Sequence, residues 1–109
     1  MHEESDQRSN MIILPITLVV GEKTLPTYAM TNTSAEGKGF IDRSWAKSHE
    51  LPLQKLKHSF GIVTFDGDLS ESGAVTHYVE ATIRIEDHTE VIRLNVTQLA
   101  HYPVILGMP

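Results

Sequence analysis

The chain contains no cysteine, few aromatic residues and no long apolar run. Without cysteine, neither a disulfide framework nor a thiolate metal site is available. The longest apolar stretch, residues 11–20, is interrupted by Pro15 and Thr17. It is too short to span a bilayer and lacks the flanks of a signal peptide. We therefore expect an intracellular protein, cytoplasmic or nuclear, with no membrane partner.

Basic residues are also in short supply. Nine Lys and Arg face fourteen Asp and Glu, which gives a formal net charge of −5. Binding to nucleic acid requires a basic patch that neutralises phosphates, and here the basic residues are scattered. The densest group, KLKH at 55–58, is interpreted as a solvated face. We expect no nucleic-acid partner.

The six histidines do not form a metal-binding motif. His77, His88 and His101 are spread along the chain without a ligand spacing such as H-E-x-x-H. The sequence therefore predicts no metal site, and no other cofactor is implied.

The length and composition indicate one domain. A chain of 109 residues, 40% of them hydrophobic and 6% aromatic, can form a single core built from Val, Ile and Leu. Residues 1–10, MHEESDQRSN, are polar and carry no apolar period, which predicts a flexible leader. The folded domain is expected over residues 11–109.

Most of this domain has the pattern of β-strands. Residues 11–30 predict two strands joined at Gly21–Lys23. Residues 59–65 lead to Asp66-Gly67, a strong tight-turn signal, and the chain then runs back towards a second turn at 86–89. The apolar positions of the later strands are interpreted as Ile83, Ile85, Val91, Leu94 and Val96.

One stretch, residues 40–52, has a convincing helix signal. Asp42 or Ser44 can cap its start, and Pro52 bars its continuation, so about two turns are expected over 43–49. The sum is a mainly β fold with one short helix, a small closed barrel or orthogonal packing of sheets.

Three stretches give the chain a resemblance to a known family. They are AEGKGFIDRSWAKSHELPL at 35–53, TFDGDLSESGAVTHYV at 64–79 and VTQLAHYPVILGMP at 96–109. The chain resembles the retropepsin-like aspartic protease domain of gypsy-type LTR retrotransposons, particularly those of filamentous fungi, from about residue 12 to its end. The resemblance implies the retropepsin fold and a homodimer whose active site lies on the two-fold axis.

The catalytic signature of that family departs from its pattern here. The family has Asp-Ser/Thr-Gly-Ala immediately before the G-x-x-F-I-D stretch, and this chain has Asn32, Thr33, Ser34 and Ala35. Two carboxyl groups of an aspartic protease share one proton, so that one acts as a base and the other as an acid. An amide has no proton equilibrium near neutral pH and cannot be a general base. We predict that the chain is inactive as a peptidase.

The other signature positions have different consequences. Ser34 replaces a glycine, and its Cβ would crowd a turn that needs close backbone approach. The resemblance gives Thr33 a hydrogen bond across the dimer axis. It also places a flap over residues 60–75 and a buttress for the active-site turn at 104–107. The substrate-binding positions that it implies are Ala35, Asp66, Gly67, Tyr102, Pro103 and Val104.

Three interpretations of function stay open. The first is a domain from a retrotransposon polyprotein, or a captured copy, that dimerises or binds peptides without cleaving them. The second is a genuine retroviral-type endopeptidase for a Gag-Pol-like polyprotein, inactivated by an engineered Asp-to-Asn change. That history explains Asn32 but not Ser34. The third is a binding domain of ubiquitin-linked type, because retropepsin folds also occur in proteasome-shuttle proteins.

Overall fold

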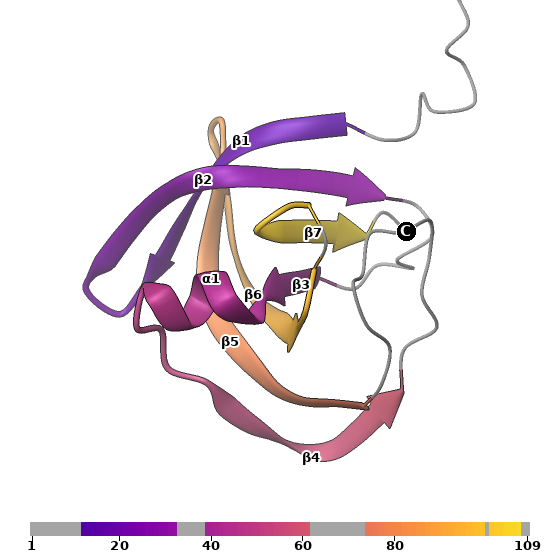
Figure 1. Cartoon of the computed structure of the whole chain (residues 1–109). Helices are drawn as coiled ribbons and strands as arrows, with labels where there is room; N and C mark the ends of the chain where they lie inside the picture. Colours follow the sequence, from indigo (N-terminus) through magenta and orange to yellow (C-terminus); the bar gives the residue numbers. More distant parts are fainter. Residues whose placement is uncertain (1–11, 33–38, 62–73, 100, 108–109) are drawn as a thin grey trace, which may run out of the picture.

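The computed structural model describes residues 12–32, 39–61, 74–99 and 101–107, and of Asn32, Gly61 and Ala74 only the backbone. These residues form seven strands and one helix (Figure 1). The elements are β1 (Ile12–Val20), β2 (Lys23–Asn32), β3 (Gly39–Asp42), α1 (Arg43–Ser48), β4 (Gln54–Gly61), β5 (Ala74–Ile85), β6 (His88–Thr97) and β7 (Val104–Gly107).

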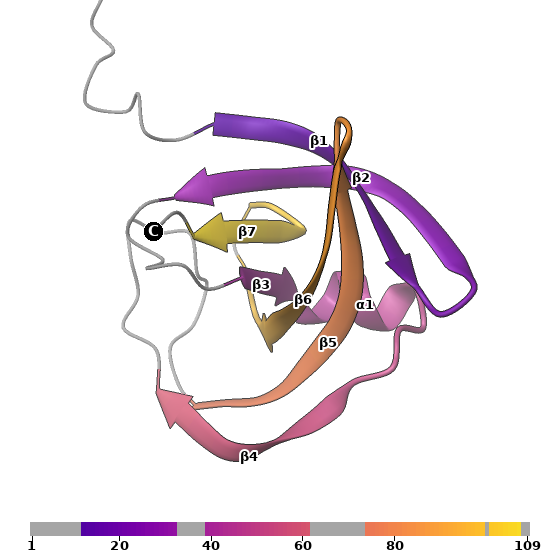
Figure 2. The ribbon, with the colours of Figure 1, turned by 180° about the vertical axis from the view of Figure 1, so that it is seen from behind.

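The strands close into a small barrel. The sheet order is β1-β2-β7-β3-β6-β5-β4, and an additional pairing of β1 with β5 closes a ring of six strands (Figures 1 and 2). β4 lies outside the ring: it pairs with residues 74–78 of β5, on the same edge that β1 pairs with at residues 82–84. The predicted fold, a mainly β closed barrel with one short helix, is confirmed.

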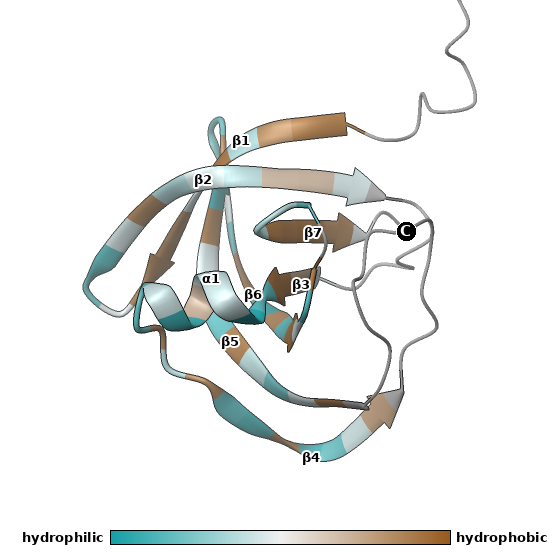
Figure 3. Cartoon of the chain, viewed as in Figure 1, coloured by the Kyte–Doolittle hydropathy of each residue, from teal (hydrophilic) through white to brown (hydrophobic). Residues whose placement is uncertain are grey.

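Aliphatic side chains fill the barrel, as the composition requires. The main core cluster joins all the ring strands and the helix, and Figure 3 shows hydrophobic residues recurring along these strands. Its fully buried members are Leu18, Ala29, Ile41, Ala46, Val79, Leu94 and Val104. Alternation along each strand places these side chains on one face of the sheet.

Two tight turns produce the two long hairpins. The β1–β2 turn consists of Gly21 and Glu22, and Gly21 has a positive φ of 60°. The β5–β6 turn consists of Glu86 and Asp87, and Glu86 has a φ of 54°. Two-residue hairpin turns demand this conformation, which glycine adopts without steric penalty. Both turns lie where the sequence predicts them.

Prolines occupy the open edges of the first hairpin. The Ile12 N–H donates to Thr31 Oγ1 at 3.1 Å, so even-numbered residues of β1 direct their backbone groups towards β2. Pro15 therefore lies where an N–H would point away from β2. Pro26, opposite Thr17, has the corresponding position on β2. Both edges lack an amide that an incoming strand would need.

Of the two predicted cap residues, Asp42 and Ser44, the first one caps helix α1. The Trp45 N–H donates to Asp42 Oδ2 at 3.0 Å, whereas Ser44 is exposed and makes no capping bond. Asp42 is thus the N-cap. The helix ends at Ser48, one residue before the predicted end.

The helix C-terminus is a Schellman motif. The Leu51 N–H donates to the Ala46 carbonyl at 3.0 Å, and the Glu50 N–H donates to the Lys47 carbonyl at 3.0 Å. The motif places Glu50 in the left-handed region, with a φ of 58°. That position usually holds glycine, because a side chain there is strained.

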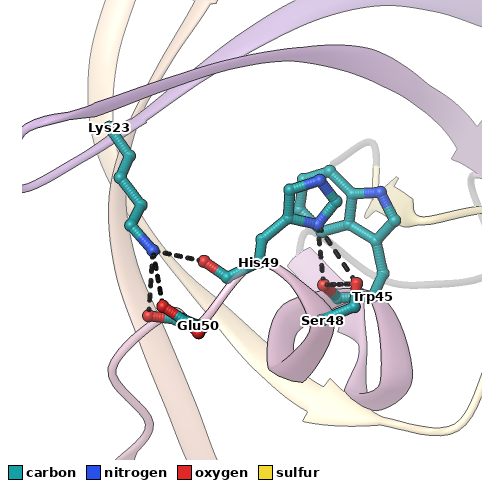
Figure 4. Close-up of polar contacts among 5 residues, drawn as sticks. All are labelled: Lys23, Trp45, Ser48, His49 and Glu50. Carbon is teal, nitrogen blue, oxygen red and sulfur yellow. Dashed lines mark hydrogen bonds and ion pairs between the residues drawn. The ribbon is translucent and has the colours of Figure 1, made fainter.

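Lys23 at the start of β2 stabilises this helix end (Figure 4). Its Nζ donates to the carbonyls of His49 and Glu50 and lies 3.9 Å from Glu50 Oε1. The last carbonyls of a helix have no partners within the helix, so a cation there satisfies them and interacts favourably with the helix dipole. The contact fastens α1 to the first hairpin.

Two features differ from the sequence predictions. β4 begins at Gln54, five residues earlier than predicted, and its pairing with β5 shifts register between Lys55 and Phe60. Val91, predicted to be one of the apolar alternating positions, is 64% exposed. Successive side chains of a strand point to opposite faces, and Leu94 is buried. The inward side chains of β6 are therefore those of Ile92, Leu94 and Val96, and Val91 lies on the outer face.

The predicted leader, residues 1–10, lies outside the described residues, as does most of the predicted flap. The base of that hairpin is present, since Phe60 pairs with Val75 and Gly61 with Ala74. In the part of the chain that the structure describes, no helix is long and apolar enough to cross a membrane.

The strained helix end gives a test of the fold. We expect Glu50→Gly to be more stable than Glu50→Ala by about 1 kcal/mol, because both variants lose only the carboxylate contact with Lys23 but glycine alone relieves the positive φ. Chemical denaturation of both variants measures the difference. Equal stabilities would contradict the Schellman end.

Candidate functional site

Three strands bring their ends together at the position that the sequence singles out. β2 and β7 run parallel, and the last residue of each, Asn32 and Gly107, are Cα partners. β3 runs antiparallel to β7 on its other side, with Gly39 opposite Leu106. Asn32 therefore ends its strand beside Gly107, and β3 begins at the same edge (Figures 1 and 2).

β7 is short but held on both sides. Its four residues pair with Ala29–Asn32 of β2, and Val104–Leu106 also pair with β3. The side chains of Val104 and Ile105 are fully buried. A strand with two hydrogen-bonded neighbours and buried side chains fixes the backbone where β2 ends.

Asp42 fixes the approach to β7. One carboxylate oxygen accepts the Trp45 N–H at the start of α1, and the other accepts the Leu99 N–H at 2.9 Å. The Asp42 N–H also donates to the Pro103 carbonyl at 2.8 Å. One residue thus ties the end of β3 to the helix and to the segment that leads into β7. This agrees with the prediction that Asp42 can cap the helix.

Thr31 ties the start of β1 to the same strand end. Its hydroxyl accepts the Ile12 N–H at 3.1 Å and donates to the Ile12 carbonyl at 3.2 Å. The residue is 6% exposed, so its hydroxyl is one of few buried polar groups in the described residues and both of its bonds are made within the protein. The first strand is thereby fastened one residue before Asn32.

A second apolar cluster lies on the opposite face from the main core. It consists of Met30, Phe40, Leu99 and Ile105, all buried, with Tyr102 packed against it. Met30 is paired with Ile105, and Ile105 with Phe40, so the cluster spans the three strands that meet at the site. It is an apolar wall beside the strand ends.

Gly39 is needed for the close packing of β3 on β6. A Cβ on this residue would lie 2.8 Å from Leu94 Cδ2, closer than side-chain carbons approach. The Gly39 carbonyl accepts a hydrogen bond from Asn95 Nδ2 at 3.1 Å. Packing against β6 thus fixes the start of β3 and with it the third strand of the site.

A groove of about 450 Å³ lies next to the same strand ends. Apolar residues of β5, β6 and β7 line it, together with a His88–Glu90 contact of 3.0 Å. The strands that meet at the site, β3 and β7, contribute Gly39, Leu106 and Gly107 to the lining of this groove. No group of three or more His, Asp and Glu among the described residues could hold a metal ion.

The structure describes some of the predicted site residues and not others. The backbone of Asn32 lies at the end of β2, and Tyr102 and Pro103 are half-buried in the segment before β7. Val104 is fully buried in the main core. Thr33, Ser34, Ala35, Asp66 and Gly67 lie outside the described residues.

Sequence reasoning missed two residues that shape the site. Thr31 stands out only as a polar residue in an apolar strand, and the pattern does not indicate its partner at Ile12. Asn95 lies in none of the motifs read from the sequence, although its amide donates to the Gly39 carbonyl. Both bonds join residues far apart in the chain, so local patterns carry no signal for either.

Comparison with protein families decides the assignment of this arrangement. The model of the PEG10/RTL1 protease domain matches residues 28–109, from the middle of β2 to the end of the chain. The chain belongs to the PEG10/RTL1 protease family. This is a retropepsin-like domain of retrotransposon origin, and the match includes position 32 and the strands β3 and β7 that surround it.

Among solved structures, the chain is similar to protein Lpg0085 of Legionella pneumophila subsp. pneumophila str. Philadelphia 1, a protein of unknown function. The two are 16% identical, with a TM-score of 0.47, over 86% of this chain and 80% of that one.

The role of Asp42 can be tested by stability. We expect Asp42→Ala to lower the free energy of unfolding by about 2 kcal/mol, because it removes the helix cap and leaves the Leu99 N–H without its acceptor. Ser44→Ala is the matched control and should change it by less than about 0.5 kcal/mol, since Ser44 is exposed. Denaturant unfolding measures both, and similar losses would contradict the assignment of the cap.

Proposed function

We propose that this domain is a catalytically inactive member of its family that pairs with a second copy through the end of β2. The observation that carries the proposal is the amide at position 32, at the strand end beside Gly107 where the family has its aspartate. The chain would then serve as a dimerisation or peptide-binding module within a retrotransposon-type polyprotein, or as a captured copy of one.

The chemistry of the dyad supports inactivity. An aspartic peptidase needs one ionised carboxyl that takes a proton from water and one protonated carboxyl that polarises the scissile carbonyl. Two asparagines on a two-fold axis could still hold a water by hydrogen bonds, but neither could remove its proton. Loss of general-base catalysis alone lowers the rate by about two to four orders of magnitude.

The fold supports a peptide groove even without catalysis. The apolar wall of Met30, Phe40, Leu99 and Ile105 lies beside the strand end, and half-buried Tyr102 packs against it. In this proposal Tyr102 and Pro103 contact a peptide side chain, with Ala35, Asp66 and Gly67 completing the groove. Thr33 braces the two copies across the axis.

The finer assignment follows from the same residues. The three stretches quoted from the sequence favour a gypsy-type element of the fungal kind, with a degenerate catalytic motif at Asn32 and Ser34. The proposed location is intracellular, in the cytoplasm or the nucleus.

Restoring the signature tests the proposal. The chain as given, Asn32→Asp, and Asn32→Asp combined with Ser34→Gly are each incubated with a mixed peptide library, and cleavage is followed by mass spectrometry. We expect background cleavage for the chain as given. The double variant should exceed it by at least about 100-fold, because general-base catalysis contributes two to four orders of magnitude.

The pH dependence supplies the control for a true dyad. Cleavage by the double variant should follow a bell-shaped pH profile, since one carboxyl must be ionised and one protonated. Ser34→Gly alone should stay at background. Cleavage by the unmodified chain above that background would refute the proposed inactivity. If the double variant is also inactive, the proposal that the substrate groove is intact would be refuted.

A further inference from the structure

Exposed apolar side chains gather on the first hairpin. Among the described residues, four large hydrophobic residues are exposed, and three of them, Ile12, Ile13 and Tyr28, lie on β1 and β2. Figure 3 shows the hydrophobic start of β1 at the outside of the barrel. Clusters of exposed apolar residues on a small domain mark interaction surfaces.

A groove on the outer face of this hairpin brings one of them, Tyr28, beside two charges. It has a volume of about 470 Å³ and includes Pro15, Pro26 and Tyr28 from the hairpin with Arg84 and Glu86 from the end of β5 and its turn. Pro15 and Tyr28 are Cα partners, so their side chains share one face. We call these five residues the hairpin patch.

The polar groups of the hairpin patch have unused bonding capacity. In the described part of the structure, neither Arg84 nor Glu86 has an ion pair or a side-chain hydrogen bond, and the Tyr28 hydroxyl, on a residue 59% exposed, has no partner there either. An unpaired cation and an unpaired anion two residues apart can each be matched by the opposite charge of an approaching surface.

The backbone limits how a partner can approach. Pro15 and Pro26 each remove one outward amide from an open edge of the hairpin. A partner strand could not form an unbroken ladder there, because one donor is missing on each edge. A partner therefore packs on the face of the hairpin patch and does not extend the sheet.

We propose that the hairpin patch is a self-association surface that binds a second copy of this chain about a two-fold axis. Such an axis, passing between Arg84 and Glu86, sets each Arg84 opposite Glu86 of the other copy, so that the two ion pairs form reciprocally. Tyr28, Pro15 and Pro26 supply rigid apolar surface beside these ion pairs. The arrangement needs no residue from any other protein.

This contact is separate from the one proposed at the end of β2. Asn32 lies six residues beyond Pro26 along the same strand, a separation of roughly 20 Å. Two different two-fold contacts on one chain build either a closed tetramer or an open array. The domain could therefore link copies beyond a pair, whether or not the contact at Asn32 forms.

Mixing charge-reversed variants tests the proposal. Arg84→Glu alone would oppose like charges across the axis, and so would Glu86→Arg alone. Each should weaken the association by at least about tenfold in a sedimentation series over concentration. An equimolar mixture of the two variants restores every pair with opposite signs. The mixture should associate within about threefold of the original chain and contain one copy of each variant.

Two controls keep the outcome decisive. Tyr28→Ser should weaken the association in every combination, and circular dichroism confirms that the variants fold. Failure of the mixture to associate, or equal association of the single variants and the original chain, would overturn the proposal. An association that ignores these charges but is lost when Asn32 is replaced by a bulky residue would leave the contact at β2 standing alone.

Discussion

The position of β7 between β2 and β3 is the constraint on which the site depends. β7 has only four residues, yet it pairs in parallel with β2 and antiparallel with β3. It enters this place because Asp42 holds the Leu99 N–H and donates its own N–H to the Pro103 carbonyl. The carboxylate that caps the helix thus also sets the path of the chain into the strand beside Asn32.

Around β7, the residues that stabilise the fold are different from the residue at the catalytic position of the family. The main core of aliphatic residues lies on one face of the three strands, and the cluster of Met30, Phe40, Leu99 and Ile105 lies on the other. The frame expected of a retropepsin-like domain is therefore present, while position 32 carries an amide. A frame can persist without its reactive group, because burial and backbone pairing maintain it and the catalytic side chain does not.

Much of the fold could be predicted from the sequence, since its signals are local. Gly21 marks the first hairpin turn, Asp42 marks the helix start, and alternation marks the strands. The prediction for Val91 is wrong because buried Leu94 fixes which face of β6 points inward, and residue 91 lies on the opposite face. The parallel pairing of β2 with β7 joins residues 75 positions apart, and local patterns carry no signal for it.

Within the site, a sequence signature names positions but not the contacts around them. Asn32 was located from a signature read along the chain, but the bonds of Thr31 to Ile12 and of Asn95 to Gly39 arise from tertiary packing. Such bonds depend on which strands become neighbours, and residue type alone does not encode that choice.

The account rests on two copies meeting at position 32, and a single cysteine tests this most directly because the chain has none of its own. If two copies meet there, Asn32→Cys should form an intermolecular disulfide under mild oxidation, since the bond requires Cα atoms within about 7 Å. Ser44→Cys, on the exposed side of α1, should remain largely uncrosslinked under the same conditions. Equal crosslinking of the two variants, or none at position 32, would contradict a dimer axis at the end of β2.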